Sequence, residues 1–198
     1  MVSAPSGAGK TTLVRALLGR EPKLEFSTSY TTRTPRAAEI DGKDYFFVSE
    51  SEFEAMRAAG AFLESARVFD NYYGTSRAVV DEHLARGRSV LLEIDWQGAQ
   101  QVRGRAPEAI SVFIMPPSKL ELARRLRGRG TDPEHVIARR LADAVADMEH
   151  WREFDYVVVN RDVERAIRAL EEILAGAGDK YRTSAVPVMA EAERILAE

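Results

Sequence analysis

The segment APSGAGKT, residues 4–11, largely decides how the rest of this sequence is interpreted. It fits the phosphate-binding pattern G-x-x-x-x-G-K-[ST] at Gly9, Lys10 and Thr11, with Ala4 in place of the first glycine. In such a loop, backbone N–H groups surround a phosphate at the N-terminus of a helix, and the lysine adds a cation. We therefore expect this loop to bind nucleotide phosphates, with Thr11 as a ligand of Mg²⁺.

The context of the loop supports this interpretation over a simple glycine-rich turn. Val2–Ala4 is typical of the end of a strand, and Lys10–Leu18 of an amphipathic helix, so the loop stands where phosphate binding requires it. Our candidate ATP-binding residues in the loop are Ala4, Pro5, Ser6, Gly7, Ala8, Gly9, Lys10 and Thr11.

Strands and helices alternate again in the second half of the chain. Buried strands are predicted over Val90–Ile94, Ile110–Met115 and Tyr156–Val159, separated by helical patterns. This alternation predicts an α/β fold with a parallel sheet that helices cover on both faces. We expect a core of residues 1–29 and 89–198, and a lobe of residues 30–88 inserted after the first helix.

Local signals also predict where several elements begin. Ser49 and Glu52 form a capping box, and Ser76 and Ser118 can each cap a further helix. A short extended stretch is expected near Phe26–Ser29. The tail from Gly176 onward has no clear pattern.

Composition excludes several classes of protein. The chain has 198 residues, no cysteine and a net charge of −3, so a disulfide framework is excluded and nonspecific nucleic-acid binding is disfavoured. No apolar run approaches the roughly 20 residues that cross a bilayer, and the first residues leave no room for a signal peptide. We therefore expect a cytoplasmic protein with no membrane or nucleic-acid partner.

The inserted lobe contains two arginines on a stiff loop and one carboxylate on an apolar strand face. Arg33 and Arg36 flank Pro35 and can hold one phosphate through forked hydrogen bonds, although solvated surface arginines are the alternative. Glu64 lies on the face Phe62, Glu64, Ala66, Val68 of a strand predicted over Phe62–Phe69. A buried carboxylate needs a partner, either an arginine or a ligand with adjacent N–H donors, such as guanine.

The lobe also contains adjacent tyrosines, Tyr72 and Tyr73. In an extended segment they point to opposite faces, so only one can face a given ligand, and we expect the other in the core.

Two further groups of charged residues lie in the predicted core. Glu93 and Asp95 end a buried strand, where they suit a hydrated Mg²⁺ or nucleotide contacts, with helix capping or structural pairing as the alternative. Arg125 and Arg129 lie four residues apart, and Arg140 follows a break in the helical pattern. Arginines around such a break are typical of a lid over phosphates, here at about residues 124–140.

Eight strings in succession resemble the guanylate kinase family over nearly the whole length of the chain. They are PSGAGKT, STSYTTRTPR, DGKDYFFV, FLESA, NYYGTS, LLEIDWQGAQ, RLRGRGTD and VVVN. The resemblance implies a P-loop nucleoside monophosphate kinase that transfers the γ-phosphoryl group of ATP to GMP or dGMP, with Mg²⁺ as cofactor.

The resemblance also implies roles for individual residues. The GMP phosphate would be held by Arg33, Arg36, Tyr45 and Tyr73. The guanine would be read by Ser29, Glu64 and Thr75, with Asp95 nearby. The ATP phosphates would be contacted during transfer by Arg125, Arg129 and Arg140, and Asn160 would lie near the adenine. The expected catalytic residues are Lys10, Arg36, Arg125, Arg129 and Arg140. Mg²⁺ would be ligated by Thr11, with Glu93 or Asp95 as candidates through water.

Two other functions use the same scaffold. A kinase of another phosphorylated substrate, such as a ribose bisphosphate, would not need Glu64 and Thr75, because such a substrate has no guanine edge. A non-catalytic interaction module that resembles guanylate kinases would have lost its P-loop function, yet Lys10, Thr11 and the lid arginines are present. Oligomeric state stays open, with a homo-oligomer as one alternative.

Overall fold

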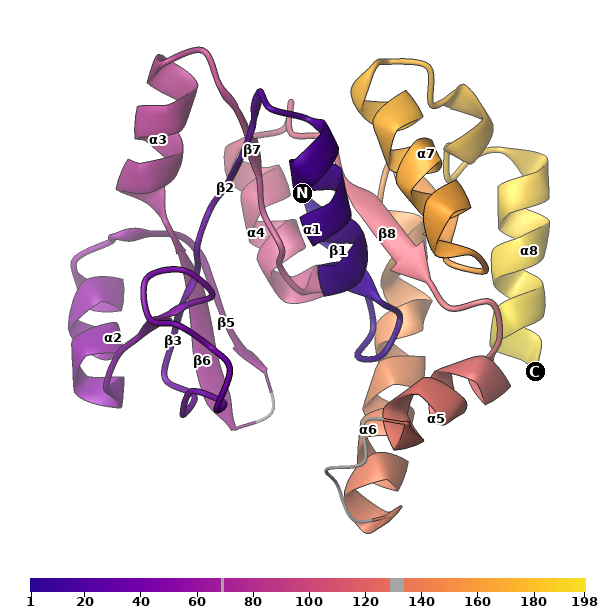
Figure 1. The fold of residues 1–198 in the computed structure, drawn as a ribbon, viewed down its shortest axis with the longest axis horizontal. Helices are drawn as coiled ribbons and strands as arrows, with labels where there is room; N and C mark the ends of the chain where they lie inside the picture. Colours follow the sequence, from indigo (N-terminus) through magenta and orange to yellow (C-terminus); the bar gives the residue numbers. More distant parts are fainter. Residues whose placement is uncertain (69, 129–133) are drawn as a thin grey trace. The chain divides into compact units, whose positions relative to one another are not determined.

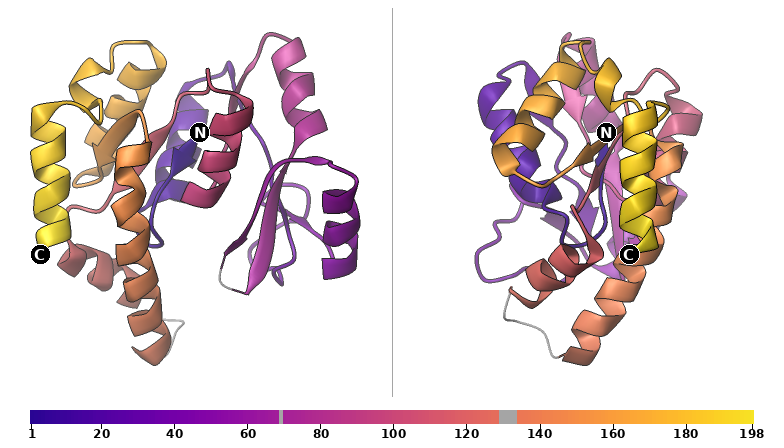
Figure 2. Two further views of the ribbon diagram at one scale, coloured as in Figure 1. Left: turned by 180° about the vertical axis from the view of Figure 1, so that it is seen from behind. Right: turned by 90° about the vertical axis from the view of Figure 1, so that its right-hand side faces the viewer.

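The computed structural model of the chain describes residues 1–68, 70–128 and 134–198. Its contacts divide the chain into two units, one of Val2–Arg20 with Ile110–Glu198 and the other of Glu21–Ala109 with Met1. Figures 1 and 2 show the elements of both units. The expected functional boundaries at residues 30 and 88 stay a prediction.

The first unit is built on a parallel sheet in the order β1 (Val2–Ser3), β8 (Val112–Met115) and β9 (Tyr156–Val159). Val2 pairs with Val112, and Val112 with Tyr156, so the three strands run in register in one direction. Every residue of β8 is buried, as expected for the central strand of a covered parallel sheet. The parallel α/β arrangement predicted from the sequence is confirmed in this unit.

Two helices of the first unit, α5 and α7, begin at side chains that cap them. Ser118 accepts a hydrogen bond from the N–H of Glu121, and Asp162 accepts one from the N–H of Arg165, at 3.0 and 2.9 Å. The helices are α1 (Lys10–Arg20), α5 (Lys119–Arg127), α6 (Glu134–Met148), α7 (Val163–Leu174) and α8 (Val186–Ala197), with short 3₁₀ turns at Glu149–Glu153 and Asp179–Tyr181.

The tail from Gly176 onward, which has no clear pattern in the sequence, ends in α8. Ala192 and Ile195 of this helix are buried, and Lys119 Nζ donates a hydrogen bond to the carbonyl of Leu196 at 2.6 Å. The views in Figures 1 and 2 agree in placing the C-terminus beside α5.

Within the described ranges, no helix is long and apolar enough to cross a bilayer.

The second unit has two sheets. One is a parallel pair of β2 (Leu24–Phe26) and β7 (Ser89–Leu91). The other has four strands in the order β4-β3-β6-β5 and shares no strand pairing with the first. The strands of that sheet are β3 (Tyr30–Thr31), β4 (Phe46–Phe47), β5 (Phe62–Val68) and β6 (Asn71–Ser76), and the helices of the unit are α2 (Glu50–Ala58), α3 (Arg77–Ala85) and α4 (Trp96–Arg105).

Two predicted strands of this unit lie earlier in the chain than expected. The strand predicted over Val90–Ile94 is β7, which ends at Leu91, the residue that pairs with the last residue of β2, Phe26. The extended stretch expected near Phe26–Ser29 likewise ends with β2 at Phe26.

An aromatic core packs α2 against the four-stranded sheet. The ring of Phe53 is fully buried and stacks on Phe62 and Tyr72, with centroids 4.6 and 5.4 Å apart. The predicted capping box at Ser49 is confirmed, since its side chain accepts from the N–H of Glu52 and Glu52 accepts from the N–H of Ser49. The start of α2 and the position of Phe53 are thereby fixed.

A β-bulge corrects the predicted faces of β5. Phe62 pairs with Ser76 and Glu64 with Thr75, so Leu63 is an extra residue between them. The Phe62 ring lies 2.8 Å from the position of a Cβ on Gly74, whereas the Glu64 carboxylate bonds to the side chain of Thr75. Phe62 and Glu64 therefore face opposite sides, and the strict alternation predicted for this strand is wrong at its start.

Phe53→Ala should lower the free energy of unfolding by about 3–5 kcal/mol, because it removes a fully buried ring and leaves a cavity. Urea denaturation would measure the change. Leu84→Ala on α3, where the side chain is 54% exposed, is the matched control and should change it by about 0.5 kcal/mol or less. Equal effects of the two substitutions would contradict this description of the core.

Candidate active site

The loop between β1 and α1 adopts the backbone that phosphate binding requires. Gly7 and Gly9 have φ values of +92° and +95°, a region that favours glycine. The N–H of Ala8 bonds to the carbonyl of Pro5 at 3.1 Å, and helix α1 starts with Leu13 N–H to Gly9 at 3.2 Å. The first turn of α1 contains no acidic residue. The helix N-terminus therefore offers its partial positive charge to an anion.

Asn160 and Arg125 hold this loop in place. The Asn160 side chain is 2% exposed and donates from Nδ2 to the carbonyl of Ala8 at 2.8 Å. Arg125 donates to the same carbonyl at 3.2 Å and to the carbonyl of Asn160 at 3.0 Å. A Cβ on Gly9 would lie 2.5 Å from Asn160 Nδ2, so only glycine leaves room for this contact. Asn160, expected near the adenine, thus also supports the P-loop.

Glu121 orients Arg125 and was not identified from the sequence. Its carboxylate accepts from Arg125 Nε at 2.8 Å and from Arg124 Nε at 2.6 Å. Hydrogen bonds from Arg124 and Arg125 lower the pKa of Glu121 to about 2. The signal for this contact was present in the sequence, since Glu121 precedes Arg125 by four residues on one helix.

The other residues predicted to contact ATP lie at different places in the first unit. Thr11 is exposed in the first turn of α1, and Lys10 is half-buried beside it. Arg140 is half-buried on α6, a helix that packs on α5. Arg129 lies outside the described residues, so its role stays a prediction.

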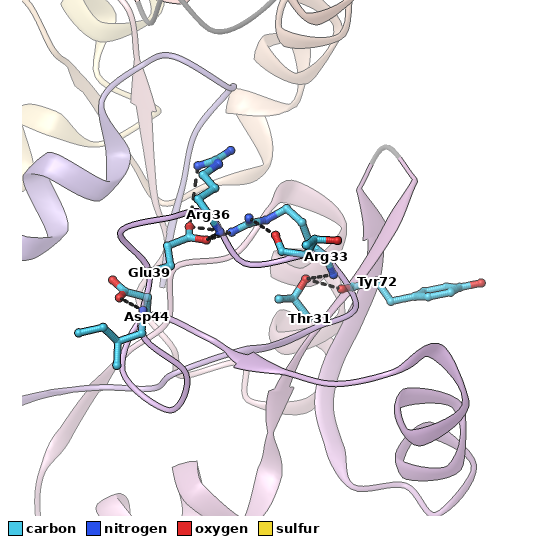
Figure 3. Close-up of polar contacts among 8 residues, drawn as sticks. Thr31, Arg33, Arg36, Glu39, Asp44 and Tyr72 are labelled. Carbon is cyan, nitrogen blue, oxygen red and sulfur yellow. Dashed lines mark hydrogen bonds and ion pairs between the residues drawn. The ribbon is translucent and has the colours of Figure 1, made fainter.

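The second unit holds the residues predicted to bind the GMP phosphate, and Figure 3 shows two of them, Arg33 and Arg36, beside Glu39. Arg33 Nη2 bonds to both carboxylate oxygens of Glu39 at 2.7 and 2.9 Å. The same carboxylate accepts from the backbone N–H of Arg36 at 2.7 Å, while the Arg36 side chain is 62% exposed. Burial opposes ionisation of Glu39, but the hydrogen bonds from Arg33 and from the Arg36 backbone outweigh it and lower its pKa. Glu39, which the sequence did not single out, thus fixes the side chain of Arg33 and the backbone of Arg36.

Two tyrosines extend this group. The Arg33 guanidinium lies 5.4 Å from the centroid of the Tyr45 ring, and the rings of Tyr45 and Tyr73 are 5.9 Å apart. Burial raises the pKa of Tyr45 to about 12, and the negative charge of Glu93 adds to the rise. Three of the four predicted phosphate ligands therefore lie together. Tyr72 is half-buried and stacks on the buried ring of Phe53, so it packs against the core of the lobe and not into this group.

The residues predicted to read the base include a buried polar pair. Glu64 is 3% exposed, and Thr75 Oγ1 donates to its Oε1 at 2.5 Å. Ser29 is buried on the segment before β3. Asp95 is the N-cap of α4, where it accepts from the N–H of Gly98 at 2.8 Å. Helix capping, one of the alternatives for this residue, is thus realised.

A glycine-rich loop between a parallel strand and a helix, with a lysine and a hydroxyl at its end, defines the class of P-loop nucleotide-binding proteins. A family model described as guanylate kinase matches residues 1–177 of the chain. The chain belongs to the guanylate kinase family.

Individual relatives agree with this assignment. Guanylate kinases from Salmonella typhimurium and from Escherichia coli (strain K12) are each 55% identical over 176 residues, covering 88% of this chain and 85% of the relative. The crystal structure of guanylate kinase from Anaplasma phagocytophilum superposes with a TM-score of 0.75 and 36% identity, over 91% of this chain and 86% of that one.

The raised pKa of Tyr45 makes stability depend on pH in the alkaline range. Between about pH 10, where an unfolded tyrosine ionises, and about pH 12, the folded state keeps a proton that the unfolded state loses. The free energy of unfolding contributed by Tyr45 therefore falls as pH rises through this window. Tyr45→Phe should make the free energy of unfolding depend less on pH in this window, as measured by urea denaturation at successive pH values. The same pH dependence in both proteins would show that the pKa of Tyr45 is not raised.

Proposed function

We propose that this chain is an ATP:GMP phosphotransferase, which transfers the γ-phosphoryl group of ATP to GMP or dGMP and gives ADP and GDP. The observation that carries the proposal is the buried Glu64–Thr75 pair in the second unit. A carboxylate with a hydroxyl partner suits the N1–H and N2 amino donors of guanine. Membership of the guanylate kinase family makes GMP the substrate whose base this pair would bind. The proposed GMP lobe comprises residues 30–88.

The ATP phosphates would lie in the P-loop. Backbone N–H groups of the loop after Pro5 and the N-terminus of α1 would bind the β- and γ-phosphates, and Lys10 would add a positive charge. Arg125, oriented by Glu121 and supporting Ala8, is a candidate for contacting the transferring group, together with Arg129 and Arg140. Asn160 is proposed to serve the adenine end of the site while it holds the loop.

The GMP phosphate would be held by the group around Glu39. Arg33 and Arg36 are proposed to share their donors between that carboxylate and the phosphate, and the hydroxyls of Tyr45 and Tyr73 would donate to phosphate oxygens. A tyrosine hydroxyl is protonated at neutral pH, so that of Tyr45 is available as a donor. Ser29 and Asp95 would complete the base site beside Glu64.

Mg²⁺ is the proposed cofactor, and the residues present fit it. The described ranges contain no cluster of three acidic or histidine side chains that could hold a metal ion. Mg²⁺ often takes most of its ligands from nucleotide phosphates and water, so the exposed hydroxyl of Thr11 is a sufficient protein ligand, with Glu93 or Asp95 through water. When bound, Mg²⁺ would neutralise charge on the phosphates.

The chemistry needs positioning and charge stabilisation more than a protein nucleophile. An oxygen of the GMP phosphate attacks the γ-phosphorus in line, and ADP leaves. No general base is required, because that phosphate is already largely ionised near pH 7. The side chains that act are therefore the donors and cations, Lys10 and the arginines.

The alternatives fit less well. A ribose bisphosphate has no base, so it would offer no N–H donors to the buried Glu64–Thr75 pair. A non-catalytic interaction module would not need the paired contacts that fix the Ala8 carbonyl and Arg125. The cytoplasmic location, the absence of nucleic-acid and membrane partners, and a homo-oligomeric state remain predictions.

Lys10→Met should lower kcat by about 100-fold or more, since it removes a charge aimed at the transferring phosphate. A coupled assay with saturating ATP and GMP would measure it, and circular dichroism would verify the fold. Lys23→Met, an exposed lysine outside the proposed sites, is the matched control. Near-normal turnover in the Lys10 variant would refute the role of the P-loop.

Base choice should follow the order GMP, then IMP, then AMP in kcat/KM. IMP keeps N1–H but lacks the amino group. It therefore loses one hydrogen bond to a charged acceptor, which is about 1.5–3 kcal/mol of binding free energy. AMP presents a lone pair at N1 to the carboxylate, so it should be rejected by about 10⁴-fold or more. Glu64→Ala should lower kcat/KM for GMP strongly and for AMP little. If both fall equally, Glu64 serves only the fold.

A further inference from the structure

Gly98, in the first turn of α4, lies against the carboxylate of Glu64 on β5. A Cβ added to Gly98 would stand 2.5 Å from Glu64 Oε2, closer than real Cβ contacts allow, and 3.1 Å from both Glu64 Cδ and Asp95 Oδ1, which is a tight contact. Gly98 has no positive φ, so its backbone does not itself require glycine. The carboxylate therefore occupies the space that any other side chain at position 98 would take.

Neither the helix nor the strand can easily retreat. The Gln101 amide bonds to both backbone groups of Ser65, accepting from its N–H at 3.1 Å and donating to its carbonyl at 2.8 Å. Arg105, a further turn along, donates to the carbonyls of Phe62 and Leu63. These contacts lie on the same face of α4 as Gly98 and join residues on both sides of Glu64. They fix the spacing between Gly98 and the carboxylate.

The carboxylate lies between Thr75 and the first turn of α4. Thr75 bonds to Oε1 at 2.5 Å, while Oε2 faces Gly98 at the N-terminal turn of α4. The partial positive charge of a helix N-terminus favours a nearby carboxylate. A shift of the carboxylate would strain the bond to Thr75 and change where its oxygens stand.

We propose that Gly98 is a specificity-determining positioning residue, which lets the Glu64 carboxylate take the position from which it accepts both guanine donors. This inference rests on the proposed reading of guanine by Glu64. Gly98 acts through Glu64 and does not itself contact the base. An added methyl group would meet the far end of a side chain instead of backbone, so the fold should tolerate it while the carboxylate moves.

The test compares two glycines of one helix. Gly98→Ala should lower kcat/KM for GMP by about 10- to 100-fold, the loss expected for one hydrogen bond to a charged group, and should weaken GMP binding measured by calorimetry without ATP. AMP turnover should change little, so the preference for GMP over AMP narrows. Gly104→Ala, where a Cβ meets nothing within 4 Å, should leave both substrates unchanged.

A double-mutant cycle assigns the effect to Glu64. Once Glu64→Ala has removed the carboxylate oxygen that would stand 2.5 Å from the added Cβ, the nearest remaining oxygen is Asp95 Oδ1 at 3.1 Å, which a small shift accommodates. Adding Gly98→Ala should then change kcat/KM for GMP little, because the two substitutions act mainly on one contact. Full additivity, or wild-type base preference in Gly98→Ala, would overturn the inference. If Gly98→Ala fails to fold, the double variant must fold, and failure of both would overturn it as well.

Different results would refute the proposed function and the inference about Gly98. If Glu64→Ala alone leaves the order of GMP, IMP and AMP unchanged, the reading of guanine by Glu64 is wrong, and the inference about Gly98 falls with it. If Glu64→Ala narrows the preference while Gly98→Ala does not, the proposed function stands and only the inference about Gly98 is wrong.

Discussion

The carbonyl of Ala8 is the acceptor on which the nucleotide loop depends. It takes hydrogen bonds from the amide of Asn160 and the guanidinium of Arg125, two side chains that come from the end of β9 and from α5. A buried carbonyl needs hydrogen-bond partners, and leaving this one unpaired would cost about 1–3 kcal/mol. Because Arg125 also bonds to the carbonyl of Asn160, three parts of the first unit share one small network.

An acidic side chain holds one of the proposed phosphate-binding arginines in each unit. Glu121 orients Arg125, and Glu39 orients Arg33 and the backbone of Arg36. Ordering a long side chain before the ligand arrives reduces the entropy lost on binding. The same carboxylates keep a group of positive charges from repelling one another when no phosphate is present. Pairing of this kind suits a site that must be formed in advance and still accept an anion.

Much of the fold could be predicted from the sequence because the relevant signals are local. The caps at Ser49, Ser76 and Ser118 and the glycine-rich loop each depend on residues within a few positions, and each is present as predicted. The α/β class followed from alternating patterns. The candidate residues of the GMP lobe came largely from the family resemblance, and the structure groups several of them.

Other features could not be predicted because they depend on distant parts of the chain. The bond between Asn160 and Ala8 joins residues 152 positions apart, and no local pattern signals it. The bulge at Leu63 depends on the register between β5 and β6, which alternation alone does not give. Glu39 lies in an irregular segment, where spacing does not determine which side chains meet.

The last helix has a practical consequence for anyone who shortens this chain. The match to the family model ends at residue 177, yet α8 buries Ala192 and Ile195, and Leu196 accepts a hydrogen bond from Lys119 in the first turn of α5. A protein that ends at residue 177 would lack α8, so the apolar residues that pack against Ala192 and Ile195 would be exposed. It would also lose the hydrogen bond from Lys119 at the beginning of α5, the helix that carries Arg125. Recombinant expression should therefore keep the C-terminal residues and place any purification tag at a distance from Glu198, whose side-chain carboxylate bonds to Arg194.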